Sequence, residues 1–224
     1  MAADVAFRPV QPASTLGTIW GFSLGVTGIQ TSASPISGTI GTGTPYLYAG
    51  DISAAIQVPL GLAVEAGYMP GISISGATLN RFGIDAKWTF TDLIFKELPF
   101  DGAVRAMYTN ASLSYSQPLN GGTVNVSYTT NITGGILQVS KKLLIVEPFA
   151  GYGLIQHTSN ISGSGSSPLF NGNFPGGTTS ASGSGSSGWG QLGVQLNLLV
   201  VTLAVEYDSM FANDTYSARF AFKF

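Results

Sequence analysis

The last eleven residues of the chain, 214–224, constrain its fold more than any other stretch. Every second residue from position 216 onward is apolar, and the positions between include two cations. A period of two is the period of a β-strand and not of a helix. The apolar positions are Tyr216, Ala218, Phe220, Phe222 and Phe224, and the cations are Arg219 and Lys223. The same alternation recurs along the chain, which predicts an all-β protein.

The composition indicates which side of these strands faces outward. Only 9% of the residues are charged, against about 25% in an average protein. The polar faces are therefore too poor in charge to coat a soluble molecule. No uninterrupted apolar run exceeds four residues, whereas a transmembrane helix needs roughly 20. In a bilayer every backbone polar group must be paired internally, so this pattern predicts a transmembrane antiparallel up-and-down β-barrel whose aromatic side chains face lipid.

A terminal Phe224 preceded by alternating aromatics resembles the C-terminal signature of bacterial outer-membrane β-barrel proteins, which their assembly machinery recognises. The resemblance implies a small porin-like barrel in the bacterial outer membrane. It also implies that outer-membrane lipids and the barrel assembly machinery are partners. No signal peptide is visible, so we expect Met1 to be a start residue added to a mature chain that begins near Ala2 or Ala3.

The alternation and the turn signals divide the chain into a periplasmic N-terminal lead-in, residues 1–16, and a barrel, residues 17–224. Ten strands are predicted, and eight or twelve also fit. Their ranges are 17–30, 46–58, 62–70, 80–90, 100–116, 123–139, 144–158, 188–197, 200–210 and 214–224. Loops at 31–45, 71–79, 117–122, 159–187 and 211–213 are predicted on one side of the barrel. Short turns at 59–61, 91–99, 140–143 and 198–199 are predicted on the other, with both termini and with one helical turn in 91–99. A bulge is expected near Gly134 and Gly135, and a local break at Pro148.

The two faces of the predicted strands carry different residue types. Buried charges must be paired, so we expect an interior charge network that includes salt bridges. Its members are Asp51, Glu65, Arg81, Asp85, Lys87, Arg105, Glu147, Glu206, Asp208, Arg219 and Lys223. The opposite face predicts a lipid-facing aromatic belt made of Trp20, Phe22, Tyr46, Tyr48, Tyr68, Trp88, Phe90, Tyr108, Tyr152, Tyr207, Tyr216, Phe222 and Phe224. Side chains just fill an eight-stranded barrel, and open channels need roughly 16 strands, so we expect a narrow or plugged lumen.

One short run could carry chemistry. His157, Thr158, Ser159 and Asn160 resemble the His-x-Ser-Asn motif of outer-membrane lipid A deacylases, in which the serine is the nucleophile and the histidine is the base. Such a family also has an acid soon after the motif, whereas no acid follows here until Glu206. We therefore predict that His157 and Ser159 are not catalytic and that the protein is not an enzyme.

Other function classes lack the residues they require. The chain has one histidine and no cysteine, so we expect no metal site and no disulfide. No cofactor fingerprint appears, and a net charge of −2 gives no nucleic-acid footprint. Three hypotheses stay open. The first is a non-enzymatic barrel with a structural or lipid-organising role, with a homo-oligomeric ring as one form of it. The second is a lipid A-modifying esterase, and the third is a narrow pore for small solutes.

Overall fold

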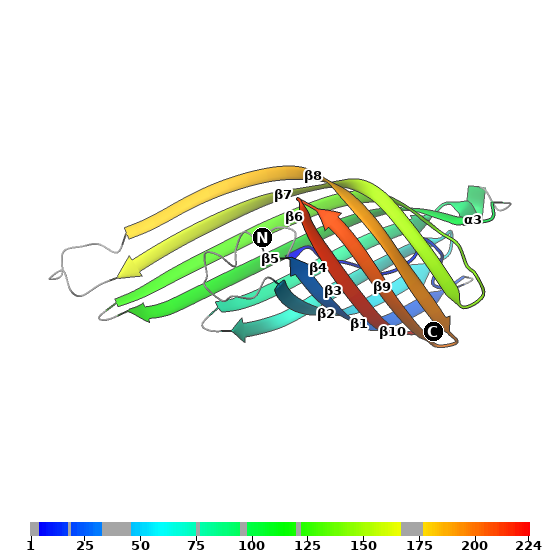
Figure 1. Cartoon of the computed structure of the whole chain (residues 1–224), viewed down its shortest axis with the longest axis horizontal. Coiled ribbons are helices and arrows are strands. Elements are labelled where there is room, and N and C mark those ends of the chain that lie inside the picture. Colours follow the sequence, from blue (N-terminus) through cyan, green and yellow to red (C-terminus); the bar gives the residue numbers. More distant parts are fainter. Residues whose placement is uncertain are drawn as a thin grey trace.

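Ten antiparallel strands form a closed barrel in which each strand pairs with its neighbours in sequence and β1 closes against β10 (Figure 1). The computed structural model describes residues 5–17, 19–32, 46–74, 77–94, 98–119, 122–166 and 177–224. The strands are β1 (Gly21–Ser32), β2 (Tyr46–Val58), β3 (Leu62–Ile74), β4 (Ala77–Thr89), β5 (Asp101–Leu119), β6 (Gly122–Ser140), β7 (Val146–Ser166), β8 (Gly177–Leu198), β9 (Val201–Met210) and β10 (Asn213–Lys223). The predicted ten-stranded up-and-down barrel is confirmed.

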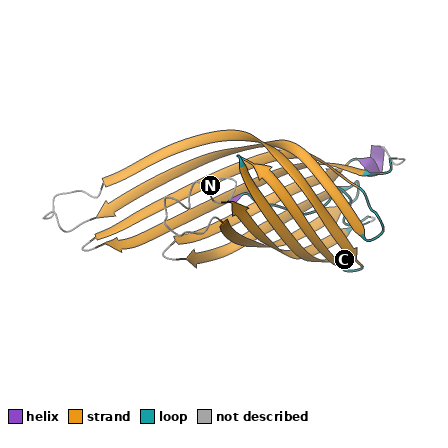
Figure 2. Ribbon diagram, in the orientation of Figure 1, coloured by secondary structure: helices purple, strands orange, loops and turns teal. Residues whose placement is uncertain are grey.

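Strands dominate the described part of the chain (Figure 2). The predicted helical turn between the fourth and fifth strands is the four-residue helix α3 (Thr91–Ile94). Among the described residues, no helix is long and apolar enough to cross a membrane. The turn between β2 and β3 is tight, and its residues Leu60 and Gly61 both have positive φ, 72° and 70°. Two consecutive positive φ values match the hairpin turn whose twist suits antiparallel strands.

Side chains alternate between the lumen and the outer wall because successive residues of a strand point to opposite faces. In β10, Ala221 is 0% exposed, whereas Phe220 and Phe222 on either side of it are 40% and 44% exposed. The same pattern holds in β4 and β9. The outer wall is therefore apolar, and the lumen is lined mainly by small and polar residues, with large apolar side chains in one cluster.

The predicted loop 159–187 is wrong over most of its length. β7 continues to Ser166 and β8 begins at Gly177, and the two strands pair without interruption from Val146↔Leu196 to Gly165↔Gly177. Glycine and serine disfavour strands, so composition predicts a loop here. The hydrogen-bond ladder with β6 overrides that tendency, since β6 pairs with β7 over the same stretch. Together β5, β6, β7 and β8 extend beyond the other strands as a projecting sheet (Figure 1).

Two local expectations in the sixth and seventh strands also differ from the structure. Gly134 and Gly135 pair in continuous register with β5 and β7, so no bulge forms there. The register shift lies between Met69 and Ile72, in β3. Pro148 does not break β7. The pairing of β6 with β7 begins one residue later, at Phe149, so no hydrogen bond of that ladder requires an N–H from Pro148.

The N-terminal residues differ from the expected periplasmic lead-in. Residues 5–17, which we call the lumen segment, run inside the barrel, and Ala6, Val10 and Ala13 have no exposed surface. Prolines and the lack of alternation placed this segment outside the barrel in the sequence analysis. Inside a barrel, however, a chain needs no strand pattern, because wall side chains can satisfy its backbone groups.

Candidate functional site

The filled lumen is the candidate functional site, and its apolar anchor is Phe7. Phe7 is 1% exposed and lies over Gly67 of β3 and Gly83 of β4, which pair with each other across the two strands. A Cβ atom built on Gly83 would lie 2.2 Å from Phe7 Cβ, and one built on Gly67 would lie 2.0 Å from Phe7 Cε2. Any larger residue at either position would therefore collide with Phe7. The paired glycines form a notch in the wall that receives the aromatic side chain.

Wall cations hold the lumen segment by its backbone. Lys87 Nζ donates hydrogen bonds to the carbonyl oxygens of Pro12 at 2.9 Å and Ser14 at 2.7 Å. Arg105 donates to the Gln11 carbonyl and Arg81 to the Ala6 carbonyl, both at 3.1 Å. Buried carbonyl groups need donors, and a segment without a strand partner cannot obtain them from a ladder. The wall side chains supply these donors.

The segment contributes side-chain contacts as well. Arg8 Nε lies 3.4 Å from Asp208 Oδ2, and both side chains are fully buried. The other carboxylate oxygen of Asp208 accepts a 2.7 Å hydrogen bond from Trp189 Nε1. Gln11 donates to Glu65 at 2.8 Å. Asp208 is thus paired with a cation that comes from the segment and not from the wall.

The wall also pairs charges within itself. Arg81 binds Asp51 through two nitrogens, at 3.1 and 2.5 Å. Arg105 reaches Asp85 at 2.9 Å, and a third pair, Arg219 with Glu65, has the same separation. All three pairs are buried, so each needs close geometry to offset the loss of hydration.

Among the described residues, two wall acids accept hydrogen bonds from neutral side chains and form no ion pair. Glu147 accepts hydrogen bonds from Ser140 and Asn197. Glu206 accepts one from Gln191, and its second carboxylate oxygen has no hydrogen-bond partner in the described part of the chain. The described wall therefore buries more acid than it neutralises.

The structure buries ten of the eleven residues of the predicted charge network and leaves Lys223 half-buried. It adds one member that sequence reasoning missed, Arg8, because that residue lay in the predicted lead-in. The available signal was a single cation in an otherwise small and apolar segment, residues 5–17. Of the thirteen predicted belt residues, eleven are exposed, and Phe90 and Tyr207 are half-buried.

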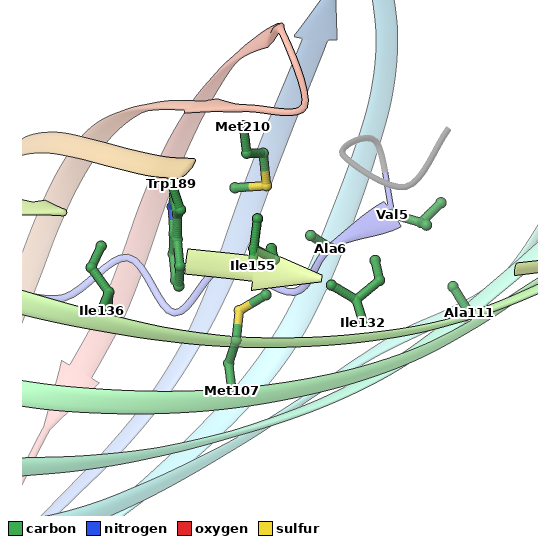
Figure 3. Close-up of a cluster of buried hydrophobic side chains, with 9 residues drawn as sticks. All are labelled: Val5, Ala6, Met107, Ala111, Ile132, Ile136, Ile155, Trp189 and Met210. Carbon is green, nitrogen blue, oxygen red and sulfur yellow. The ribbon is translucent and has the colours of Figure 1, made fainter. Parts of the chain in front are cut away.

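A hydrophobic cluster lies in the lumen beside the buried charges. Its nine residues include Val5 and Ala6 of the lumen segment, which meet side chains from five strands (Figure 3). The wall members are Met107, Ala111, Ile132, Ile136, Ile155, Trp189 and Met210. Along β5, Met107 and Ala111 follow Arg105 toward the projecting sheet. Arg81 pairs with Ala111 across β4 and β5, and Arg8 contacts Met210, so the cluster lies beside the buried charges in the lumen.

The His157–Ser159 pair lies on the inner face of β7, where both residues are half-buried. His157 Nδ1 is 3.0 Å from Ser159 Oγ, within hydrogen-bond reach. Ser159 donates instead to Thr130 Oγ1 at 2.8 Å and also contacts the Tyr128 hydroxyl at 3.0 Å. The His157 ring packs edge-on against Phe211. The structure thus brings the two candidate residues together within a cluster of hydroxyl groups.

The acids that could orient His157 have other partners. Asp208 is held by Arg8 and Trp189, and Asp214 accepts a 2.7 Å hydrogen bond from Tyr207. A catalytic serine works best when its histidine is oriented by a carboxylate. Neither Asp208 nor Asp214 is therefore available to orient His157.

An apolar groove of about 750 Å³ crosses the outer wall from β2 over β1, β10, β9 and β8 to β7. Its floor includes the small residues Gly28 and Ala218, which pair with each other. Tyr48, Tyr216 and Leu192 line it and are among the exposed side chains of the wall. This surface has the shape and polarity to accommodate hydrocarbon chains.

Comparison with known proteins gives one family match. The sequence profile of a family of unknown function (DUF6588) matches residues 10–224. No curated protein matches the sequence.

Several solved structures of bacterial outer-membrane barrels are similar in fold. The outer membrane protease OmpT from Escherichia coli is 11% identical, with 92% of this chain and 94% of that chain covered and a TM-score of 0.47. A major outer membrane protein from Thermus thermophilus is 9% identical, with 92% and 100% covered and a TM-score of 0.41. Ail, the attachment invasion locus protein of Yersinia pestis, is 11% identical, with 92% and 100% covered and a TM-score of 0.37.

Proposed function

The chain belongs to the family of unknown function DUF6588, and we propose that it is a non-enzymatic barrel of the bacterial outer membrane whose lumen is closed by its own N-terminal segment. The observation that carries the proposal is the burial of residues 5–17 among the wall charges. Four wall cations bind carbonyl groups of that segment, and Arg8 pairs with Asp208. A lumen filled in this way supports a structural or lipid-organising role at rest and not diffusion of solutes.

The partners we infer follow from the outer wall. Outer-membrane lipids cover the exposed aromatic residues and the groove over Gly28 and Ala218, and the barrel assembly machinery inserts the protein. A homo-oligomeric ring stays a prediction. Crosslinking in native membranes would test it, since a ring gives a ladder of defined multimers and a monomer gives one band.

Planar-bilayer recording tests the closed lumen. We expect the purified wild-type protein, verified as a monomer, to insert with little or no ion conductance. Folding is checked in the same sample by the shift in gel mobility between heated and unheated barrel. A large, stable conductance from the folded monomer would contradict the proposal.

A lipid A esterase is the second candidate, favoured by the 3.0 Å separation of His157 Nδ1 and Ser159 Oγ. We propose that this pair is not catalytic, because the serine proton is donated to Thr130 and the nearby acids are engaged by other residues. The assay is deacylation of lipid A in vesicles by the wild type and by Ser159→Ala. Activity that is present in the wild type and lost in the variant would place the esterase first.

A further inference from the structure

We propose that the barrel wall encloses a cation-selective pathway, which the lumen segment closes as a releasable plug held in place by Phe7 in the Gly67–Gly83 notch. This inference rests on the proposed function, because it requires a lumen that is closed at rest. It adds a second state of the same lumen and assigns a class of solute, small cations, to that state.

The width of the barrel gives the first argument. An eight-stranded barrel has an interior that side chains alone just fill, and the diameter grows roughly linearly with strand number. This barrel has ten strands and therefore a wider interior. The lumen segment, residues 5–17, occupies that extra space. Removing the segment would leave a passage that the wall side chains do not fill.

The attachment of the segment gives the second argument. The ladder around the barrel is complete without it, because β1 pairs with both β2 and β10. The described contacts of the segment with the wall are side-chain hydrogen bonds, the Arg8–Asp208 ion pair and apolar packing. The segment can therefore leave without breaking a strand pair.

The notch gives the third argument. Glycine weakens the interior of a strand because it has no side chain to pack. Two glycines at paired positions of β3 and β4 are explained by Phe7, since a Cβ atom at either one would lie within 2.2 Å of that side chain. The wall is thus shaped to receive one particular residue of the segment.

The charges give the selectivity. The described wall buries six acids and four bases, and the segment supplies one more base, Arg8. Once the segment leaves, Asp208 loses its cation, while Glu147 and Glu206 have no ion pair among the described residues. A passage lined by an excess of one sign of charge concentrates ions of the opposite sign. The emptied lumen should therefore prefer cations.

The experiment compares variants in planar bilayers under a potassium chloride gradient. Deletion of residues 5–16 removes most of the plug, and Gly83→Ala expels Phe7 while keeping the full chain. Gly190→Ala is the matched control, because a Cβ atom at Gly190 meets nothing within 4 Å. Overpacking of the notch should raise the open fraction about 5- to 150-fold, and the control should stay at the wild-type level.

Selectivity and rescue give independent readouts. The reversal potential of the open variants should shift toward that of potassium. Adding Asp208→Asn and Glu206→Gln to the deletion should reduce this shift. A synthetic peptide that covers residues 5–17 should close the deletion variant again when added to the bath.

The outcomes separate this inference from the proposed function. Conductance in the folded wild type would defeat the closed lumen itself. If the wild type does not conduct, and the deletion and Gly83→Ala variants fold but do not conduct either, the releasable plug is wrong and the closed barrel is retained. Open variants that prefer anions or show no preference would overturn the charge argument. If the deletion or Gly83→Ala fails to fold, Phe7→Ala, which leaves the wall unchanged, decides by the same criteria.

Discussion

Replacing Val205 with arginine tests whether the outer wall lies in hydrocarbon. Val205 is 59% exposed and is the fifth residue of β9, which has ten residues. Ten residues that rise about 3.4 Å each at a tilt of about 45° span roughly 24 Å, close to the apolar band of about 25 Å in outer-membrane barrels. Val205 thus lies near the middle of the membrane.

The expected cost follows from that depth. An arginine on the lipid face costs about 2–4 kcal/mol at the midplane and about 0–1 kcal/mol near the interfaces. Val194 pairs directly with Val205, so Val194→Arg should cost as much as Val205→Arg. Leu203 lies about 5 Å nearer to the turn by the same rise and tilt, so Leu203→Arg should cost less. Val201→Arg, at the first residue of β9, should cost least.

The assay is equilibrium unfolding by guanidinium from lipid vesicles, read by tryptophan fluorescence and by gel mobility. Val205→Ala is the control that shortens the side chain without adding charge. A loss graded with depth supports the placement of the belt. Unchanged stability in both Val205→Arg and Val194→Arg, or an equal loss at Val201, would refute the reasoning.

Three further predictions concern the lumen, and each is measured by the same unfolding assay. Asp51→Asn should lower the free energy of unfolding by about 3–5 kcal/mol, because it leaves the buried Arg81 without its acid, whereas Asp214→Asn, at an exposed acid, should have little effect. Trp189→Phe should cost about 1–3 kcal/mol, because it keeps an aromatic ring but removes the N–H that binds Asp208. Ile132→Ala should cost about 2–5 kcal/mol, because Ile132 is fully buried in the hydrophobic cluster.

Barrel strands were predictable wherever one face contacts apolar surroundings. In β10 the alternation of phenylalanine with small or charged residues sets the strand, its register and its inward face together. The charged inward residues, such as Arg81 and Asp85, follow from the same period of two. Because one face of each strand contacts lipid and the other faces a polar lumen, apolar and polar residues alternate along the sequence.

The part of the projecting sheet formed by β7 and β8 was not predictable in this way, because its sequence carries no apolar alternation. From residue 177 to 188 of β8 the side chains are glycine, serine, threonine and alanine, and residues 178–184 are exposed on both faces. With no apolar side to bury, no period of two arises. The strand exists because β7 supplies a long hydrogen-bond ladder, and such long-range pairing is not visible in local composition.

The lumen segment escaped prediction for a related reason. Its partners lie far apart in the chain, from Gln57 to Thr215. Phe7 reads as an isolated aromatic until the notch at Gly67 and Gly83 is known. The inward position of each wall charge was predictable, but the position of the lumen segment that binds these charges was not.

The state of Lys87 links the closed lumen to the proposed pathway. Among the described residues, its amine has two hydrogen bonds, both to carbonyls of the lumen segment, and no ion pair. A buried cation that loses its partners is strongly destabilising unless water replaces them. A dry, empty lumen is therefore not a stable alternative to the plugged one. If the segment stays, it supplies the carbonyl groups that Lys87 binds. If it leaves, water must enter the lumen to hydrate Lys87. The same water would hydrate ions that pass through the lumen.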